Sequence, residues 1–297
     1  MTSKNLFATV LTHAAPSANY RGESEENRTV LQKITRNNHE YTVISPEAMR
    51  NALREILAAW GLPTNRRRLH DEDQLAVEFQ AFPDAATYAD DFLFGFMVAD
   101  KDAIKKHRGQ PAKRDSVLRM NLAVALTPYR FGATFHQSPL NAGDSPWKNA
   151  ATSALLHREV AWTAYQFPFA LALGDCASGQ GPVWARKLIE AMGQLSNVAG
   201  GHARSYFEMA PRSVVARLTP SLVAGFDTYG FDEAGGFPEL ARLRAGDLPA
   251  DEFWIAGDLA RSLPPAQRAA LEGAGAHLFD NPQRGLDALA EAALAGL

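Results

Sequence analysis

Two arginines one turn apart, near the start of a predicted helix, form a candidate anion-binding site. Ser45 is placed as an N-cap and is followed by Pro46, which suits the first helical position. Arg50 and Arg54 come next, close to the helix end whose free amides and dipole attract anions such as phosphate. The spacing alone favours a simpler interpretation, in which Arg50 pairs with Glu47 on a solvated surface.

Other cations stand in polar segments without an apolar face. Those in the predicted loop from Pro16 to about Glu40 are Arg21, Arg28, Lys33 and Arg36. Between Lys101 and Arg130, eight basic residues accompany only two acidic ones, Asp102 and Asp115. A polyanion could bind there, and a solvated loop is the alternative. The formal net charge of the whole chain, -3, argues against a general nucleic-acid coat.

The sequence gives no support for catalysis. Its histidines are scattered singly, and it contains neither a GxxxxGK[ST] phosphate loop nor a GxSxG nucleophile motif. The dipeptide His70-Asp71 resembles that of metal phosphohydrolases, but a single dipeptide often arises by chance. We therefore predict a protein that is not an enzyme and that needs no metal or other cofactor.

Composition predicts a globular protein of the cytoplasm. The 297 residues are 46% hydrophobic, enough to bury a full core. Cys176 is the single cysteine, which excludes a disulfide framework and fits a reducing compartment. No apolar run reaches the roughly 18 residues of a membrane span, and the N-terminus lacks the apolar run of a signal peptide.

The predicted elements alternate in a way that is typical of an α+β fold. A helix begins at Pro46 and ends near Gly61, and Met49, Leu53 and Leu57 belong to its apolar stripe. The other expected strands and helices are a strand at 6–12, a helix or strand at 117–127, a strand at 160–173, a helix at 182–195, strands at 213–218 and 253–256, and a C-terminal helix from Leu286. This order suits a sheet covered on one face, such as a split βαβ or RRM-like core.

Two segments interrupt that order. Residues 62–115 are polar and broken by prolines, which indicates an insertion. Residues 129–158 form a long irregular stretch, and a stretch of that length is usually a functional loop or protrusion.

Four segments, in order along the chain, resemble one known family. SANYRG and the following NRTVLQKITRNNHEYTVISPEAMRNALRE match an extended loop and a Ser-x-x-x-x-Lys/Arg helix start, at Ser45 and Arg50. DDFLFGFMVAD at 90–100 is similar to Asp-x-x-Leu-Phe-Gly-x-Met, and the loop at 127–158 precedes the aromatic strand WTAYQFPFAL. GGHARSYFEMAPRSVV resembles a Gly-Lys-x-Asn-Ser-Phe stretch. Together, over about residues 4–220, they resemble the Cas-seven family, the backbone of type I CRISPR Cascade, most closely its type I-B DevR or autoregulator branch.

The resemblance implies a fold in parts. It implies an RRM-like (ferredoxin-like) palm from residues 1–61 and 117–220, with a β-hairpin thumb at about 127–158. A helical finger domain would be inserted at 62–116. Residues 221–297 match no motif and would form a C-terminal extension that completes or flanks the palm.

The resemblance also implies a function. Such subunits polymerise head to tail along a CRISPR guide RNA as a helical filament, present it for pairing with target DNA, and bind other Cascade subunits. The guide-binding residues that it implies are Asn19, Arg21, Lys33, Arg36, Ser45, Arg50, Arg54, His136, His202 and Arg204. The sequence departs from the family pattern at Glu47, where many relatives carry Gln, and at His202 and Arg204, which replace Lys and Asn.

Two alternatives stay open. Related backbone subunits of type III complexes cut RNA with an acidic loop residue, and Asp144 lies in the matching loop, so a metal-dependent ribonuclease is one of them. A transcriptional autoregulator is the other, although the chain has no recognisable helix-turn-helix.

Overall fold

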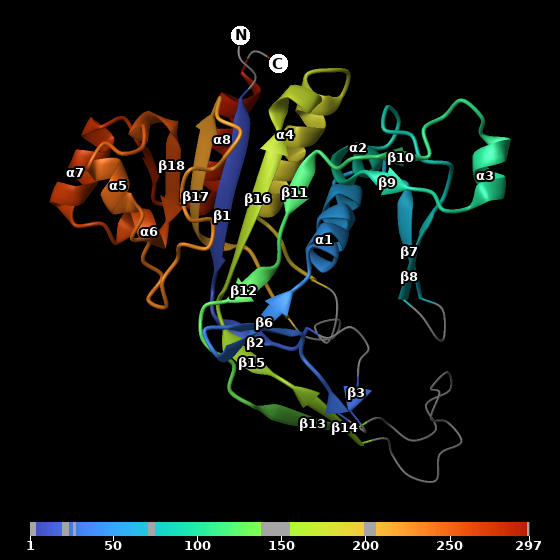
Figure 1. The fold of residues 1–297 in the computed structure, drawn as a ribbon, viewed down its shortest axis with the longest axis horizontal. Helices are drawn as coiled ribbons and strands as arrows, with labels where there is room; N and C mark the ends of the chain where they lie inside the picture. The colour runs from blue at the N-terminus through green and yellow to red at the C-terminus, as the bar shows by residue number, and fades with distance from the viewer. Residues whose placement is uncertain are drawn as a thin grey trace.

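A central sheet with helices on both faces organises the protein. The computed structural model describes residues 4–19, 24–25, 28–70, 75–137, 155–198, 206–295 and 297. Among them, nine strands form the central sheet (Figure 1). In spatial order they are β19 (His277–Phe279), β18 (Phe253–Gly257), β17 (Pro211–Thr219), β1 (Asn5–Thr12), β16 (Tyr165–Ala172), β12 (Ala123–Ala125), β6 (His39–Ile44) and β5 (Lys33–Arg36), with β11 (Leu118–Met120) also paired to β16. All neighbours are antiparallel except β18 and β19, which are parallel.

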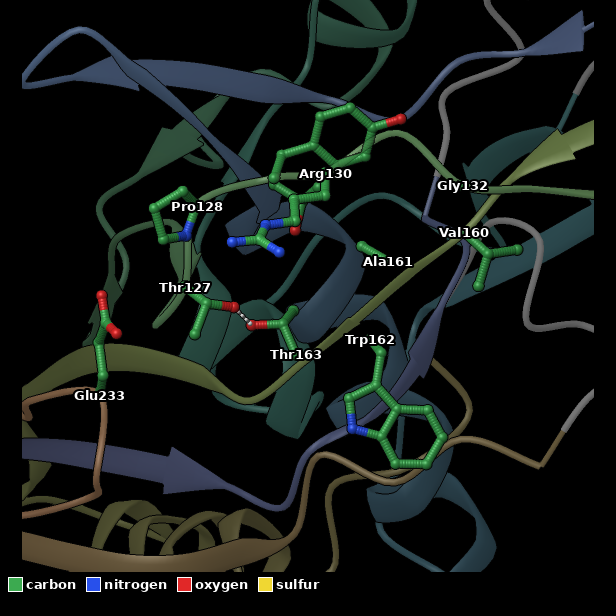
Figure 2. A pocket seen from close by; sticks show the side chains of 11 residues that line it. Thr127, Pro128, Arg130, Gly132, Val160, Ala161, Trp162, Thr163 and Glu233 are labelled. Atoms are coloured by element: carbon green, nitrogen blue, oxygen red, sulfur yellow. Dashed lines mark hydrogen bonds between the residues drawn. The ribbon is translucent and has the colours of Figure 1, made fainter.

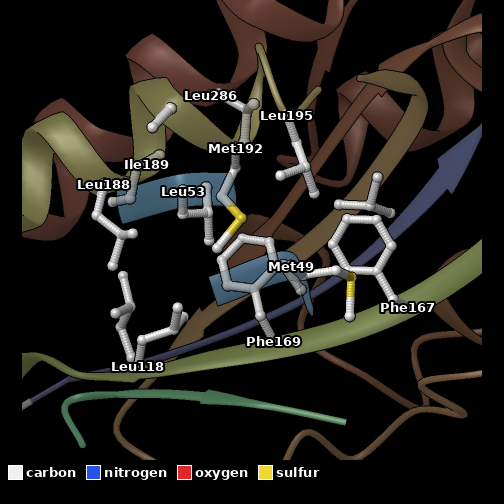
Figure 3. Packing of buried hydrophobic residues seen from close by; sticks show 14 of the residues in the cluster. Met49, Leu53, Leu118, Phe167, Phe169, Leu188, Ile189, Met192, Leu195 and Leu286 are labelled. Atoms are coloured by element: carbon white, nitrogen blue, oxygen red, sulfur yellow. The ribbon is translucent and has the colours of Figure 1, made fainter. Parts of the chain in front are cut away.

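Strand alternation builds a core on each face of this sheet. In β1, Leu6, Ala8 and Val10 enter one apolar cluster, whereas Leu11 enters the other. The first cluster includes α1 (Pro46–Ala59), α4 (Gly181–Met192) and α8 (Pro282–Leu294), and Figure 3 shows α1 and α4 packing on β16. The second lies under α5 (Leu240–Arg244), α6 (Asp258–Arg261) and α7 (Pro265–Gly273). Because side chains alternate with period 2, one strand serves both cores.

The predicted helix at residue 46 is confirmed in detail. The Ser45 hydroxyl accepts a hydrogen bond from Ala48 N at 3.2 Å, and Pro46 is the first helical residue. Gly61 takes a φ of 81° just past the end, a left-handed conformation that suits glycine. The predicted strands at 6–12, 160–173, 213–218 and 253–256 and the predicted helix at 182–195 are also present, and α8 begins at Pro282 instead of Leu286. Residues 117–127 form strands rather than a helix.

The predicted loop from Pro16 to Glu40 is wrong. This segment contains β2 (Ala15–Ser17), β3 (Ser24–Glu25), β4 (Arg28–Thr29) and β5. Asn37 and Asn38 both have positive φ, 49° and 63°, and form the two-residue turn between β5 and β6. These strands are short and polar, so hydrophobic alternation does not reveal them.

The described part of the segment at 129–158 is a strand pair. β13 (Ala133–Gln137) pairs antiparallel with β14 (Leu155–Glu159), and β14 pairs in parallel with β4. The next strand, β15 (Ala161–Thr163), pairs with β2. Residues far apart in sequence therefore form two small sheets, β13-β14-β4-β3 and β15-β2, below the central sheet in Figure 1.

The inserted segment at 62–116 combines short helices with strand pairs. Its elements are β7 (Arg66–His70), β8 (Leu75–Phe79), α2 (Ala89–Phe94), β9 (Phe96–Met97), α3 (Lys101–Lys106) and β10 (Lys113–Arg114). The pairs are β7 with β8 and β9 with β10. The segment extends to one side of α1, with α3 at its far end (Figure 1).

A buried polar network holds this segment together internally. Asp90 accepts hydrogen bonds from the backbone nitrogens of Asn65 and Arg66, at 2.8 and 3.0 Å. The Asn65 side chain donates to Asp91 at 2.8 Å. Both aspartates are at most 1% exposed, so their acceptor oxygens depend on these partners. The Asp-Asp pair of the sequence motif thus joins the start of β7 to α2, and Asp90 also accepts from Arg54 of α1 at 3.0 Å, which links the segment to the core.

Gly95, which follows these aspartates, is expected not to tolerate a side chain. Its φ is 65°, and an added Cβ would lie 2.5 Å from the Arg114 carbonyl oxygen. We expect Gly95→Ala to lower the free energy of unfolding by about 1–3 kcal/mol because of backbone strain. The added methyl group would also displace the backbone of Arg114, which should lower stability further. Gly109→Ala is the matched control in chemical denaturation, because Gly109 has a φ of 95° but an added Cβ meets nothing within 4 Å. Equal losses would contradict a role for the close approach.

Candidate nucleic-acid interface

Arg50 lies at the start of α1 but does not form the predicted surface pair with Glu47. Its guanidinium Nη2 donates to the Leu118 carbonyl at 3.2 Å, and the residue is half-buried. Burial lowers the pKa of Arg50, while the nearby charge of Glu47 raises it. The guanidinium Nε has no hydrogen-bond partner among the described residues. Arg50 is thus held between α1 and β11, and its unpartnered Nε is buried.

Arg54 is placed differently from the expectation. Its Nε donates to the Asp90 carboxylate at 3.0 Å, and the guanidinium lies 5.1 Å from the centre of the Phe94 ring. The Arg54 residue is 5% exposed. Burial, followed by the charge of Arg66, lowers the pKa of Arg54 to about 10, so it stays charged at neutral pH. Its geometry is that of a buried ion pair joining α1 to α2.

Lys33 belongs to a cluster around a buried carboxylate. Glu159, which is 3% exposed, accepts hydrogen bonds from Lys33 Nζ and from Leu31 N, both at 2.9 Å. It also forms an ion pair with Arg28, whose Nε lies 3.6 Å from the carboxylate. Lys33 Nζ also lies 4.4 Å from the centre of the Tyr129 ring. Burial would raise the pKa of Glu159, but these hydrogen bonds and charges lower it overall. The cluster joins β5 to β14.

The remaining predicted residues are spread around this region. Asn19 is buried and donates to the Val43 carbonyl at 3.3 Å, so it fixes β6. Arg36 is exposed at the end of β5. His136 lies in β13, but its side chain is outside the described residues, as are Arg21, His202 and Arg204. Ser45 and Arg50 lie at the start of α1, directly after β6, whereas Arg36 pairs with His39 at the opposite end of the β5–β6 pair.

The basic run from Lys101 to Arg130 is divided in space. Lys101, Lys105 and Lys106 lie on α3 at the far end of the insertion, and all three are exposed (Figure 1). Arg130 lies instead in the connection between β12 and β13. The run therefore does not form one continuous surface.

Sequence reasoning missed a cleft beside Arg130. The cleft measures about 510 Å³ and is lined by Arg130, Trp162, Thr127, Thr163 and Glu233 among others (Figure 2). The Trp162 side chain on β15 is 72% exposed. The available signal was the alternation in AWT, where Ala161 and Thr163 are buried and the residue between them faces out. An exposed indole beside an exposed arginine is typical of a surface that stacks bases.

Removing the charge of Glu159 is expected to loosen the junction of β5 and β14. Glu159→Gln leaves Lys33 and Arg28 without their counter-charge, so we expect the free energy of unfolding to fall by about 1–3 kcal/mol at neutral pH. Because the pKa of Glu159 is lowered in the folded state, its stabilisation is complete above the ordinary value of 4.5 and is lost as pH falls through the lowered pKa. Denaturation measured at several pH values checks this.

The matched control is Glu40→Gln, because Glu40 is exposed on the neighbouring strand β6. The difference between the two variants should shrink with falling pH. A constant difference would contradict a role for the carboxylate charge.

The described residues contain neither a metal-binding cluster nor a membrane-spanning helix. Within the described ranges, no group of three or more His, Cys, Asp or Glu side chains could hold a metal ion. None of the helices within those ranges is long and apolar enough to cross a membrane.

Known structures share the fold of this chain, and a known sequence shows its family. No family model matches it. Among the solved chains that share the fold, one is described as a CRISPR RNA-guided surveillance complex, pre-nicking, with a TM-score of 0.63 and 12% identity over 97% of this chain and 100% of that one. Another is described as a CRISPR RNA-guided surveillance complex, with a TM-score of 0.56 and 15% identity over 97% of this chain and 99% of that one. The fold is thus a mixed α+β fold found in such complexes.

The family follows from sequence. The chain is 34% identical over 293 residues to the CRISPR-associated protein Cas7/Cst2/DevR of Myxococcus xanthus (strain DK1622), with 93% of each protein covered. The chain belongs to the Cas7/Cst2/DevR family, and the resemblance to the Cas-seven family is confirmed.

Proposed function

We propose that this chain is the guide-RNA-binding backbone subunit of a type I CRISPR surveillance complex, of the type I-B kind, and that it is not an enzyme. The observation that carries the proposal is the 34% identity to a Cas7/Cst2/DevR protein over 93% of both chains. The near-complete coverage supports a common organisation of the two proteins along most of their length. The complex would act in antiviral defence in the cytoplasm.

The strand order supports an RRM-like palm. Along the chain, β1, α1, β11, β16, α4 and β17 follow the order strand, helix, strand, strand, helix, strand. In space their strands stand in the antiparallel order β17-β1-β16-β11. Two interleaved split βαβ units give this arrangement. Residues 1–61 and 117–220 would be the palm, the β13–β14 pair the thumb, 62–116 the finger, and 221–297 an extension that adds β18 and β19.

The guide would lie over the start of α1, held through its phosphates. Ser45 and Arg50 supply an N-cap and a cation there, whereas Arg36 lies opposite His39 at the other end of the β5–β6 pair. Arg21, His202 and Arg204 would add to them from segments outside the described residues. Asn19 and Lys33 act by positioning β6 and β14, and Arg54 by holding the finger. His136 would come from the thumb. Phosphate contacts set register, and base pairing supplies specificity.

The partners follow from this role. Further copies would add head to tail through unlike surfaces, which yields a helical filament along the guide. Target DNA would be reached by pairing with the guide, and other Cascade subunits would cap the filament. No observation favours the ribonuclease or autoregulator alternative, and Asp144 lies outside the described residues.

Co-expression with guide RNAs of two lengths tests this proposal. We expect purified particles whose length, measured by electron microscopy, increases with the length of the guide. The same preparation without guide RNA is the control. Particles of one length with both guides, or a protein that copurifies with no RNA even beside its partner subunits, would reject the backbone role.

A further inference from the structure

A second cleft, named here the Arg114 cleft, lies between the inserted segment and the start of α4. It measures about 380 Å³, a volume in the range of small-molecule sites, and such sites are common where two parts of a fold meet. Its walls are lined by Ala86, Phe92 and Arg114 from the inserted segment and by Ser178, Gln180 and Trp184 from the chain around the start of α4. None of its described lining residues belongs to the guide-binding set proposed above.

Arg114 gives this cleft a positive charge that no carboxylate balances. Among the described residues that line the cleft, Arg114 alone is charged. Its guanidinium carbon lies 4.7 Å from the centre of the Phe92 ring, and no ion pair or side-chain hydrogen bond joins it to another residue that the structure describes. The side chain is half-buried. Because a partly desolvated cation without an acceptor is costly, an anion bound beside Arg114 would be stabilised.

The polar groups of the cleft favour a single carboxylate. One guanidinium balances one negative charge, and its planar fork matches the two oxygens of a carboxylate. The Gln180 side chain makes no capping hydrogen bond to α4, so its amide can donate to the same anion. The Ser178 hydroxyl is exposed on the same wall. A phosphate dianion would keep one charge uncompensated in this cleft.

The rest of the lining suits an apolar ligand body. The rings of Phe92 and Trp184 meet edge to face, with centres 5.5 Å apart and planes at 61°. Beside them, Ala85 and Ala86 offer only methyl groups, which leaves the space in front of the rings open. An apolar group placed there loses contact with water, which is worth about 25 cal/mol for each Å² buried.

Hydrogen bonds hold both walls in place before any ligand binds. On the inserted side, the Asp91 carboxylate accepts from Asp84 N at 3.0 Å, and Asp84 accepts in turn from Ala86 N at 2.9 Å. On the other side, Gly181 N donates to the Ser178 carbonyl at 3.0 Å. A preorganised site of this kind loses less entropy when it binds a ligand.

We propose that the Arg114 cleft binds a small monocarboxylic acid with an apolar body. The carboxylate pairs with Arg114 and receives a hydrogen bond from Gln180, and the apolar body lies against Phe92 and Trp184. Because the ligand contacts the inserted segment and α4 together, its binding also stabilises their contact. The inference does not depend on the proposed function, since it uses none of the guide-binding residues.

Calorimetric titration of the full chain with phenylacetate, a probe with one carboxylate and one ring, tests the proposal. We expect a dissociation constant of about 1 mM or lower, and about tenfold weaker binding of the uncharged phenylacetamide. Inorganic phosphate should bind more weakly than phenylacetate. Thermal unfolding of the same protein should shift to higher temperature with phenylacetate, because the ligand binds only the folded chain.

Four variants locate the binding. Arg114→Met should weaken phenylacetate binding about tenfold or more, and Arg114→Lys should recover part of the loss. Ala86→Leu should block the cleft without touching the core, because Ala86 is exposed. Arg119→Met is the matched control and should bind as the native chain does, since Arg119 is an exposed arginine of the nearby strand β11.

Three outcomes would overturn the inference. The first is no binding of phenylacetate by the native chain up to about 10 mM. The second is native affinity in both Arg114→Met and Ala86→Leu, once denaturation has shown that these variants are folded. The third is binding by the free chain that is lost in particles assembled on guide RNA, which would show that another subunit covers the cleft. Each of these results leaves guide binding untouched, so the proposed function is judged separately.

Discussion

Replacing Arg54 with methionine is expected to destabilise the protein by about 3–5 kcal/mol, since it leaves the buried carboxylate of Asp90 without its charge partner. The side chains of the pair are 6% and 0% exposed, and their N to O distance is 3.0 Å. Asp90 would keep its backbone donors from Asn65 and Arg66, but two neutral hydrogen bonds do not replace a guanidinium. Urea denaturation measures the loss.

Arg50→Met is the matched control for this prediction. Arg50 lies one turn earlier on the same helix, is half-buried, and donates to a backbone carbonyl instead of a carboxylate. We expect it to lower stability by about 1 kcal/mol. Similar losses from the two substitutions, or a loss of RNA binding by Arg54→Met without a loss of stability, would contradict the structural role and return Arg54 to the guide-binding set.

The sequence predicted the helix that carries both arginines but not their different roles. Ser45, Pro46 and Gly61 are local signals, and local signals fix where a helix begins and ends. Arg54 comes directly after Leu53 of the apolar stripe and is buried beside it. The helical period assigns charged residues to the outer face, so it does not predict this burial. Its partner Asp90 is 36 residues away, and a contact of that separation leaves no pattern in either segment alone.

The same limit explains the missed strands and the missed cleft. β4 is a two-residue strand whose neighbour is β14, and the carboxylate of Glu159 that holds the two together comes from beyond residue 150. Central strands such as β1 and β17 are buried on both faces and are predicted by their apolar runs. The cleft combines side chains from three segments, so Trp162 could be recognised only by its place between two small buried residues.

Reversing the charge of Arg50 is expected to weaken RNA binding about tenfold, because a charged hydrogen bond to phosphate is lost and a repulsion is added. Fewer counterions are then released, so the slope of log affinity against log salt should become shallower by about 1. The guanidinium is held by Leu118 O at 3.2 Å, which fixes its position at the start of α1. Fluorescence anisotropy over a salt series measures affinity and slope together.

Arg50→Lys distinguishes charge from shape at this position. Lysine keeps the positive charge but cannot make a bond to the Leu118 carbonyl and a second bond with the same planar fork. We therefore expect Arg50→Lys to keep the native salt slope and to bind RNA a few-fold more weakly. Arg50→Glu should show both a shallower slope and the larger loss of affinity. If Arg50→Glu binds with unchanged affinity and slope although denaturation shows it folded, the start of α1 is not a phosphate site, and the guide must be held by Arg36 and by cations outside the described residues.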